Sequence, residues 1–569
     1  MLLNRFLPLA LWVAIVFIIT RPLAASAKNS FFGASHSRDI WKVLLFALLF
    51  LALFAWRAPI LFYPGELNPD ESSFIAQALG YARHWLPFSQ DGVTSGPLNS
   101  YVLMWPMLAG KPLSYLTIRL TGLVCVFITL VFSIKTLSAI VGENRSLPLA
   151  LPLIAFYLFA YRPDFVHYSS EHLPVALFAI SLWLTTVLWK HMNGRAAFVL
   201  GIILGAIPFS KLQAAPLAVY LFFVALGLIW SKKGKSGDKQ TAARTLACLV
   251  TGTASTPLFL GIVVIANGML GDVFQRYIVS PWHYGTNIRW YQIGTHVHMA
   301  IQLLKHGLEF TIYFLGMLIC AGLGVALLGL ARMKRITRSW WVGFILIFGY
   351  FFLAWWVVLK PNLAFIHYLL LLPVPTLLVI AWIVRGGVLF LDRGLIRRFQ
   401  PWAAVLPVAL SLLPIPIRLV WFSTNPRIVE IKRGVTVKPF DPVSEYIRKV
   451  TAPGDCLAVW GWTPKYYVET QLPPATCDVI AYYDILSYDY YRAAYLKDLK
   501  RTMPRVFVDS AGEMEWGQPL ELSRAVNYPP LARFLADNYR LAVEITTPVD
   551  PEPGSVPAKP PVLIYLRKD

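Results

Sequence analysis

The stretch "WKVLLFALLFLALFAWRAPILF" (Trp41–Phe62) is 22 residues long and almost wholly apolar, which is the length of a helix that crosses a membrane. A few residues later, "NPDESSFIAQALGYARHW" (Asn68–Trp85) sets Asp70 and Glu71 at the head of an amphipathic segment. The order of these stretches predicts a membrane span followed by a helix that begins with two carboxylates.

The composition of the whole chain agrees with this start. Over 569 residues, 57% are hydrophobic and only 14% are charged, which excludes an ordinary soluble enzyme and indicates a polytopic membrane protein. The net charge of +21 could suggest nucleic acid, but much of the Lys and Arg lies in short clusters between apolar runs. We therefore expect no nucleic-acid partner.

Apolar runs recur along the chain, and we expect about eleven transmembrane helices. The ranges are Trp41–Phe62, Tyr115–Val141, Leu147–Ala160, Leu173–Leu188, Ala196–Ile207, Pro216–Trp230, Leu246–Ala266, Thr311–Leu330, Trp340–Leu359, Ile366–Val384 and Trp402–Trp421. If the N-terminal end of the first span lies on the cytoplasmic side, the basic clusters all face the cytoplasm, as the positive-inside rule requires. These clusters are Lys190/Arg195, Lys232/Lys233/Lys235, Arg332/Lys334/Arg335/Arg338 and Arg393/Arg397/Arg398. The acidic loop and the tail after Phe422 then lie on the outer face.

The first 40 residues contain a shorter apolar stretch with two interpretations. It has the charged start and small-residue end of a signal peptide. However, Lys28, Arg38 and Lys42 flank the next span and favour an additional short hydrophobic segment or an over-extended start. We divide the chain into an N-terminal segment (1–40), a transmembrane domain (41–421) and an outer domain (422–569).

The outer domain is expected to be a small α/β fold. Asp441-Pro442 can cap and begin a helix, and "CLAVWGW", "PRVFVDS", "YRLAVEI" and "VLIYLRK" are typical of strands. Cys456 and Cys477 lie in this domain, where an oxidising compartment permits a disulfide; two separate buried thiols are the alternative.

The opening acidic helix also has two interpretations. Asp70 can be the N-cap of a helix along the membrane interface, with Glu71 in the first turn and Glu71, Gln77 and His84 away from the apolar face. Alternatively, Asp70 is a general base for a reaction at the membrane surface. The two roles are compatible.

Further polar side chains fall on the same outer face in this topology. They are Glu171, Lys211, Arg276, His283, Lys360, His367 and Tyr368. Snorkelling cations, an aromatic belt or simple packing would also explain most of them. Glu171 and Lys211 are stronger candidates, because a charge at the boundary between spans is costly without a partner or a task.

The segments "NPDESSFIAQAL", "SGPLNSYVLMWPMLAGKPLSYLTIRL", "HYSSEHLP", "GAIPFSKLQAAP", "FIHYLLLLPVP" and "GDCLAVWGWTPKYYVETQLPPAT" together resemble the GT-C membrane glycosyltransferases. The resemblance is to the branch that contains the protein O-mannosyltransferases and the lipid A aminoarabinose transferase. It covers nearly the whole chain from about Trp41. Its anchor is the Asp-Glu pair after the first span.

The resemblance implies a GT-C-like fold with interfacial helices in the first outer loop, and a transferase of the bacterial inner membrane with its site on the extracytoplasmic side. The donor would be a sugar on a polyprenyl-phosphate carrier, and the acceptor a glycan, a lipid or a protein. The implied catalytic residues are Asp70, Glu71 and Glu171; the donor-phosphate ligands are Lys211, Arg276 and Lys360; and the substrate-binding residues are His84, His283, His367 and Tyr368.

A divalent cation, Mg²⁺ or Mn²⁺, held by Asp70 and Glu171 is a further expectation from the resemblance. One departure concerns the sugar: many members have a Lys and two prolines where this chain has "VTSGPLNSY". A lipid-linked sugar flippase or transporter, or a non-catalytic envelope assembly protein, remains an alternative.

Overall fold

The structure is a computed structural model that describes residues 35–84, 86–89, 95–236, 239–279, 293–330, 337–361, 365–390, 441–480, 489–510, 524–546 and 561–568. The chain divides into two compact units. The first is formed by Met1–Phe62, Gly122–Ile262 and Val279–Arg433, and the second by Tyr63–Thr121, Val263–Ile278 and Gly434–Asp569. The predicted boundaries at residues 40 and 41 lie within α2, and those at 421 and 422 lie outside the described residues.

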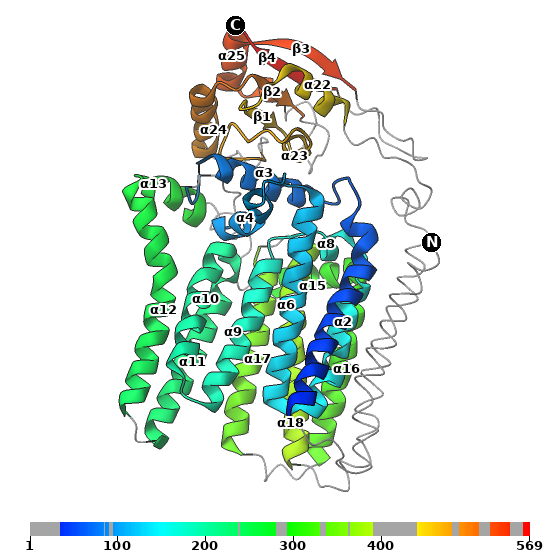
Figure 1. Ribbon diagram of the computed structural model, residues 1–569, viewed down its shortest axis with the longest axis vertical. Coiled ribbons are helices and arrows are strands. Elements are labelled where there is room, and N and C mark those ends of the chain that lie inside the picture. Colours follow the sequence, from blue (N-terminus) through cyan, green and yellow to red (C-terminus); the bar gives the residue numbers. More distant parts are fainter. Residues whose placement is uncertain are drawn as a thin grey trace. The chain divides into compact units, whose positions relative to one another are not determined.

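The first unit is helical (Figure 1). Its elements are α2 (Ser35–Leu61), most of α6 (Tyr115–Val141), α7 (Glu143–Phe159), α8 (Pro163–Val166), α9 (His172–Lys190), α10 (Gly194–Ser210), η1 (Leu212–Ala214), α11 (Ala215–Ser236), most of α12 (Lys239–Ala266), α15 (Ile293–His306), α16 (Leu308–Leu330), α17 (Arg338–Leu359), η4 (Ile366–Leu371) and α18 (Pro373–Phe390).

The predicted membrane segments correspond to these helices. The first ten predicted ranges are each helical over nearly their whole length, and the eleventh, Trp402–Trp421, lies outside the described residues. Within the described residues, seven helices are long and apolar enough to cross a membrane, and Gly194–Ser210 and Leu308–Ile319 are shorter apolar helices. The prediction of a polytopic helical membrane protein is confirmed.

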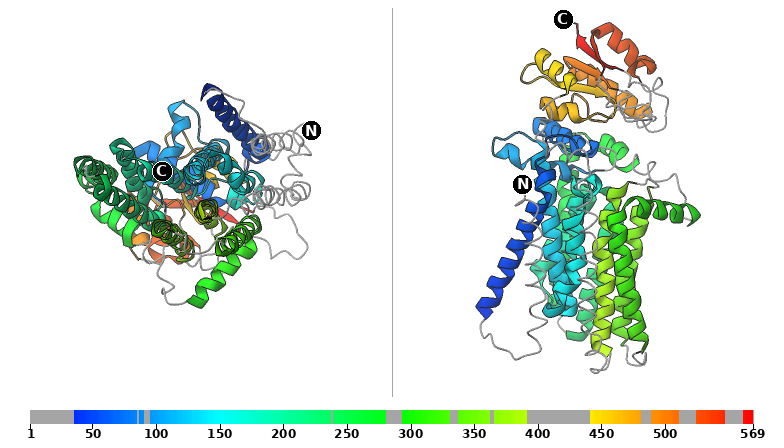
Figure 2. Two further views of the ribbon diagram at one scale, coloured as in Figure 1. Left: turned by 90° about the horizontal axis from the view of Figure 1, so that it is seen from below. Right: turned by 90° about the vertical axis from the view of Figure 1, so that its right-hand side faces the viewer.

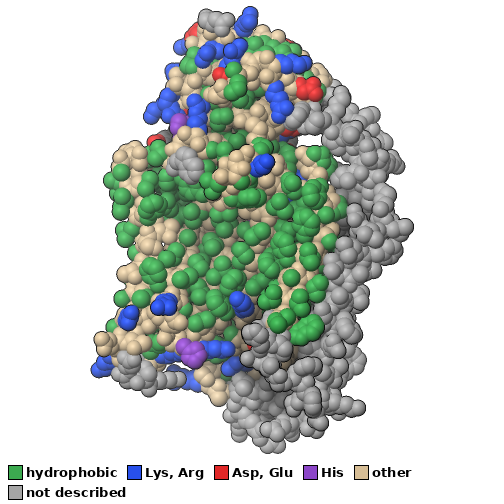
Figure 3. Space-filling model, in the orientation of Figure 1, with side chains coloured by type: hydrophobic (Ala, Val, Ile, Leu, Met, Phe, Trp, Pro, Cys, Tyr) green, Lys and Arg blue, Asp and Glu red, His purple; other side chains and the backbone are tan. Residues whose placement is uncertain are grey.

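The long helices of the first unit lie side by side (Figure 2) and differ in how deeply they are buried. The span Ile366–Gly386, which contains most of α18, is 94% buried, whereas the spans of α12 and α17 are each 22% buried. A helix that is apolar all round belongs in the centre of a bundle. The outer helices expose Phe223, Phe259 and Phe352, and Figure 3 shows hydrophobic side chains over most of the visible helical face. Such a surface suits lipid.

The second unit combines the acidic loop with the predicted outer domain. Its helices are α3 (Pro69–His84), α4 (Pro97–Leu103), α5 (Trp105–Leu108), α13 (Leu270–Val273), η2 (Phe274–Val279), α22 (Pro442–Val450), α23 (Lys465–Thr470), α24 (Asp489–Thr502), η7 (Ala525–Asn527) and α25 (Pro529–Asn538). Its strands are β1 (Leu457–Trp460), β2 (Val506–Asp509), β3 (Tyr539–Ile545) and β4 (Val562–Arg567). The four predicted strands and the helix that begins after Asp441 are confirmed.

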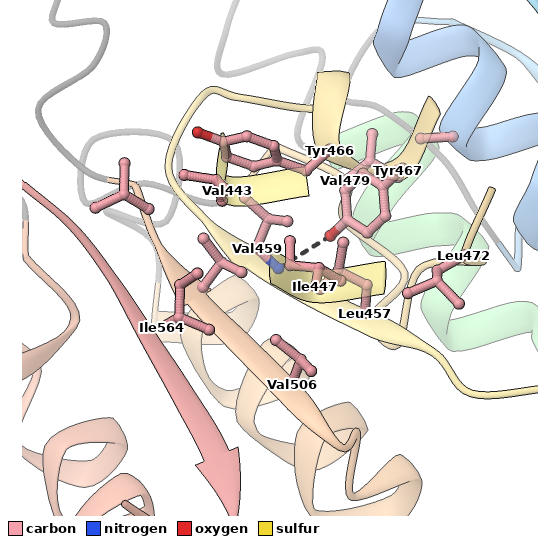
Figure 4. Packing of buried hydrophobic residues seen from close by; sticks show 13 residues of the cluster. Val443, Ile447, Leu457, Val459, Tyr466, Tyr467, Leu472, Val479, Val506 and Ile564 are labelled. Carbon is pink, nitrogen blue, oxygen red and sulfur yellow. Dashed lines mark hydrogen bonds between the residues drawn. The ribbon is translucent and has the colours of Figure 1, made fainter. Parts of the chain in front are cut away.

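The four strands form one sheet in the order β1-β2-β4-β3. β1 and β2 are parallel, while β4 runs antiparallel to both β2 and β3. Every residue of β1 and β2 is buried, so these strands lack the polar alternation of a half-exposed sheet. Figure 4 shows one of the two cores that cover this sheet, in which the Tyr467 hydroxyl accepts a hydrogen bond from the Val459 backbone N–H at 3.1 Å.

The structure corrects the predicted start of α3. The side chain of Asn68 accepts a hydrogen bond from the Asp70 backbone N–H at 2.9 Å, so Asn68 is the cap and Asp70 lies inside the first turn. The predicted polar face is wrong as well, because every residue from Glu71 to Tyr81 is buried. Ala76 belongs to the same hydrophobic cluster as Val443 and Tyr466, so α3 packs against the outer-domain elements of its own unit.

Cys456 and Cys477 form no disulfide and are two separate buried thiols. Cys456 packs in a core with Ala458 and Trp460, and the backbone N–H of Cys477 donates to Asp498 at 3.0 Å. The structure therefore agrees with the alternative of two separate buried thiols rather than a disulfide.

Candidate functional site

Glu71 and Arg119 form a buried ion pair in the second unit. The guanidinium donates from Nε to Oε1 at 2.8 Å and from Nη2 to Oε2 at 2.7 Å, and neither side chain is exposed. This two-point contact fixes the plane of the carboxylate as well as its distance. The predicted catalytic carboxylate Glu71 is thus fully engaged with a cation from the first turns of α6.

Arg119 also holds the chain just before α3. Its Nη1 donates to the Tyr63 carbonyl at 2.6 Å and its Nη2 to the Gly65 carbonyl at 2.7 Å. The backbone N–H of Leu67 donates to Glu71 Oε2 at 3.2 Å. One guanidinium therefore ties the turn that precedes Asp70 to the helix that carries it. Asp70 itself is only partly buried at the start of α3.

Glu171 and Lys211 form a second buried ion pair, in the first unit. The ammonium of Lys211 donates to the carboxylate of Glu171 and, at 2.6 Å, to the Ser170 hydroxyl. Although burial opposes ionisation, the nearby Lys211 ammonium and the His367 imidazole lower the pKa of the Glu171 carboxyl well below its usual range. The Glu171 carboxylate is therefore ionised at neutral pH.

Local backbone geometry places these two charges. Glu171 is the residue before α9, at the end of the short connection from α8. Lys211 is the residue after α10, and its extended backbone (φ −155°, ψ 114°) ends that helix three residues after Pro208. A proline in the last turn weakens the helix, since it cannot donate a backbone hydrogen bond. Both charges thus lie at helix ends.

The predicted residues His367 and Tyr368 join this cluster from η4. The Lys211 ammonium lies 4.6 Å from the centre of the Tyr368 ring, and His367 Nε2 lies 4.0 Å from Glu171 Oε2. The structure therefore brings together four of the predicted site residues, and all four are buried. The result is one cation, one carboxylate and two aromatic rings in a single cluster.

Arg276 lies in the second unit on η2. Its guanidinium is buried 3.5 Å from the carboxylate of Asp478, a residue that the sequence analysis did not single out. Burial raises the pKa of Asp478, and the guanidinium opposes that rise. Since Lys211 belongs to the first unit, the convergence of Arg276 and Lys211 on one phosphate stays a prediction.

The remaining predicted residues have different outcomes. The Lys360 ammonium lies 5.6 Å from the centre of the Trp356 ring. His84 is exposed in the last turn of α3, about 20 Å along the helix from Asp70 at 1.5 Å per residue, so these two do not share a site. His283 lies outside the described residues.

Sequence reasoning missed Arg119. The signal that could have revealed it is a charge in an apolar span, which is costly without a partner.

Sequence reasoning also missed Asp164 and His167. With His367 they form the one group of metal-ligand side chains in the described part of the chain, with ligand atoms within 4.8 Å of one another. The predicted ligands Asp70 and Glu171 lie in different units, and Glu171 is engaged with Lys211.

The chain has the GT-C-like membrane fold that the resemblance implied, as a comparison with solved structures shows. A search of solved structures matches it to ArnT from Cupriavidus metallidurans, in a crystal structure bound to undecaprenyl phosphate. The match covers 92% of this chain and 97% of that chain with a TM-score of 0.54, at 13% sequence identity. The likeness therefore establishes the fold. No protein-family model and no curated protein sequence matches the chain.

Proposed function

We propose that this protein transfers a sugar from a polyprenyl-phosphate carrier to an acceptor at the outer face of the bacterial inner membrane. The observation that carries the proposal is a fold shared with a protein whose crystal structure holds undecaprenyl phosphate. This chain adds a buried lysine, Lys211, at the end of an apolar helix, where a lipid phosphate can be met by a positive charge. The acceptor is a glycan, a lipid or a protein.

The reaction exchanges one bond for another at the first carbon of the sugar. The acceptor hydroxyl loses its proton to a base and forms a bond to this carbon, while the bond from the carbon to the carrier phosphate breaks. The products are the glycosylated acceptor and polyprenyl phosphate. Because phosphate is a stable anion, the leaving group needs positive charge nearby more than it needs an acid.

Asp70 is the proposed base. It lies in the first turn of α3, partly buried, so its carboxylate is accessible. We assign Glu71 a positioning role, since its carboxylate is occupied by Arg119. The same guanidinium holds the turn before Asp70, and it therefore fixes where the base stands.

Lys211 and Arg276 are the proposed ligands of the carrier phosphate, with Lys360 as a third cation. Glu171 holds the ammonium of Lys211 in place through a direct ion pair. His367 and Tyr368 flank the same ammonium and are the proposed contacts to the donor headgroup.

The test is sugar transfer by membranes that contain equal amounts of wild-type or Asp70→Asn protein. A labelled lipid-linked sugar pool is supplied, and label that leaves the polyprenyl-phosphate fraction is counted. Asp537→Asn, which removes an exposed carboxylate from α25 of the same unit, is the matched control.

We expect wild-type and Asp537→Asn protein to transfer label at similar rates and Asp70→Asn to be slower by at least about 100-fold, the usual contribution of a general base. Equal transfer by all three proteins would show that Asp70 is only part of a helix start. Label that crosses the membrane while still attached to its carrier would support the transporter alternative.

A further inference from the structure

The short helix α8 and the 3-10 helix η4 bring a carboxylate and two imidazoles together inside the first unit. Asp164 lies in α8, His167 directly follows it, and His367 lies in η4. One ligand atom of each residue lies within 4.8 Å of the others, and His367 Nδ1 is 3.8 Å from Asp164 Oδ1. Both imidazoles are buried.

The hydrogen bonds of His167 define which ring nitrogen is available. Its Nδ1 lies 2.7 Å from the Tyr168 carbonyl oxygen, which can only accept, so Nδ1 carries the proton. The other nitrogen, Nε2, therefore presents a lone pair. Nε2 is buried and has no hydrogen-bond partner among the described residues. A buried acceptor without a partner destabilises the folded state, and a bound cation would remove that cost.

The two ring nitrogens of His367 face two different carboxylates. Nδ1 faces Asp164 in the cluster, whereas Nε2 lies 4.0 Å from Glu171 Oε2 on the other side of the ring. Histidines that bind a metal through one nitrogen usually direct the N–H of the other toward a carboxylate or a carbonyl. His167 has this pattern through the Tyr168 carbonyl, whereas His367 Nε2 only faces the Glu171 carboxylate at 4.0 Å, beyond hydrogen-bond distance.

From this geometry we propose that Asp164, His167 and His367 bind one zinc ion. Two imidazole nitrogens and one carboxylate oxygen are a common zinc donor set, whereas magnesium and manganese prefer oxygen ligands. Tetrahedral zinc ligands lie about 3.3 Å apart, so ligand atoms up to 4.8 Å apart must close by up to about 1.5 Å on binding. Three protein ligands leave the fourth position for a water or an anionic oxygen.

The site goes beyond the proposed function, and its test needs no sugar donor. Full-length protein in detergent is stripped with a chelator, dialysed and titrated with Zn²⁺ against a coloured competitor. We expect about one ion per wild-type chain, with affinity at least about 100-fold weaker in His167→Ala, because loss of a direct ligand exceeds the effect of losing an outer partner. His298→Ala, which removes an exposed histidine from α15, is the matched control and should bind like wild type.

A second variant tests direct coordination. It also keeps the proposal testable if His167→Ala misfolds. In His167→Cys the thiolate replaces one zinc ligand with another, so binding should persist. With Co²⁺ as the probe, this variant alone should gain a thiolate-to-metal absorption band. Wild-type protein that retains no zinc, equal affinity in His167→Ala, or a missing thiolate band would overturn the proposal. Asp164 and His367 would then be an ordinary ion pair, and the sugar-transfer proposal would be unaffected.

Discussion

Arg119 and Glu71 each depend on the other, because both are fully buried charges. Removing one partner from a buried pair leaves the other uncompensated and costs about 3–5 kcal/mol. We therefore expect Arg119→Met to lower the unfolding temperature of the purified protein strongly. Arg501→Met, which removes an arginine that is 66% exposed in its pair with Asp498, should change stability by less than about 1 kcal/mol. Similar unfolding temperatures for the two variants would contradict this account of Arg119.

Lys211 should affect binding of the donor. Because its loss also leaves the buried carboxylate of Glu171 uncompensated, Lys211→Met is assayed below its own unfolding temperature. We expect Lys211→Met to raise the KM for the lipid-linked donor by at least about tenfold, since a hydrogen bond from a charged group contributes about 1.5–3 kcal/mol. Lys305→Met, at an exposed position of α15, is the matched control for loss of one positive charge. A donor KM equal to that of wild type in Lys211→Met would remove Lys211 from the phosphate site.

Glu66 gives the second unit a pH dependence. Burial raises the pKa of Glu66 from 4.5 to about 7. Neighbouring groups change this pKa by smaller amounts, some upward and some downward. The hydrogen bond from Ser72 and the charge of Lys465 lower the pKa, while Glu71 and Glu469 raise it. The Tyr115 hydroxyl lies 2.8 Å from the Ser72 hydroxyl in the same cluster.

Because the pKa of Glu66 is higher in the folded chain, the folded state retains a proton that the unfolded state has lost. Its contribution to stability is full below about pH 4.5 and decreases as the pH rises to about 7, by about 3 kcal/mol in total. Unfolding at pH 5 and pH 8 should therefore differ less in Glu66→Gln than in wild type. Glu445→Gln, at an exposed position of α22, should keep the wild-type difference. An unchanged difference in Glu66→Gln would refute the assignment.

The sequence could reveal single residues only where a local pattern marked them. Asp70 and Glu71 were visible as adjacent acids after a span, and Lys211 as a charge between spans. The partner of Glu71 was not predicted, because Arg119 is 48 residues away in the chain. His167 was not predicted as a ligand, since one histidine gains that meaning only when His367 folds beside it.

At the scale of elements, α10 and α12 cross with their backbones in close contact. A Cβ added to Gly205 would overlap the backbone of Thr253, and one on Gly201 would overlap the Leu249 carbonyl. Small residues four apart allow membrane helices to approach in this way. The glycines of α10 therefore set the spacing between these two helices.

Gly205→Ala should destabilise the protein by about 1–3 kcal/mol, as overpacking does in a closely packed core. Gly227→Ala in α11 is the matched control, because a Cβ there has nothing within 4 Å. The control should be neutral or stabilising by up to about 1 kcal/mol, since alanine is the better helix former. Thermal unfolding of both variants in detergent measures this, and equal losses would refute the close crossing.

Most elements were predictable because their patterns are local. Apolar runs marked the described spans, and the four strands and the Asp441 cap were visible in short segments. The surroundings of α3 were not predictable. Its apolar side chains suggested a helix half embedded at an interface, but α4 and residues more than 350 positions later bury every residue from Glu71 to Tyr81.

At the scale of the whole molecule, the chain consists of a helical unit and a unit that joins the first loop to the tail. The first unit holds the Lys211–Glu171 pair, and the second holds Asp70 with its Arg119 support. Composition alone predicted the membrane class, and the order of motifs predicted the fold. The first loop and the tail are far apart in the sequence, yet they belong to one unit. No local sequence pattern could predict this long-range contact.

The most direct test of the proposed reaction uses the purified chain in lipid vesicles. A donor labelled in its sugar is supplied with a mixture of candidate acceptors, and both sugar transfer and the release of polyprenyl phosphate are measured. The account predicts one polyprenyl phosphate released for each sugar transferred by wild-type protein, and at least about 100-fold less in Asp70→Asn. Sugar that reaches the opposite side of the vesicle while still on its carrier, or equal release in Asp70→Asn, would contradict it.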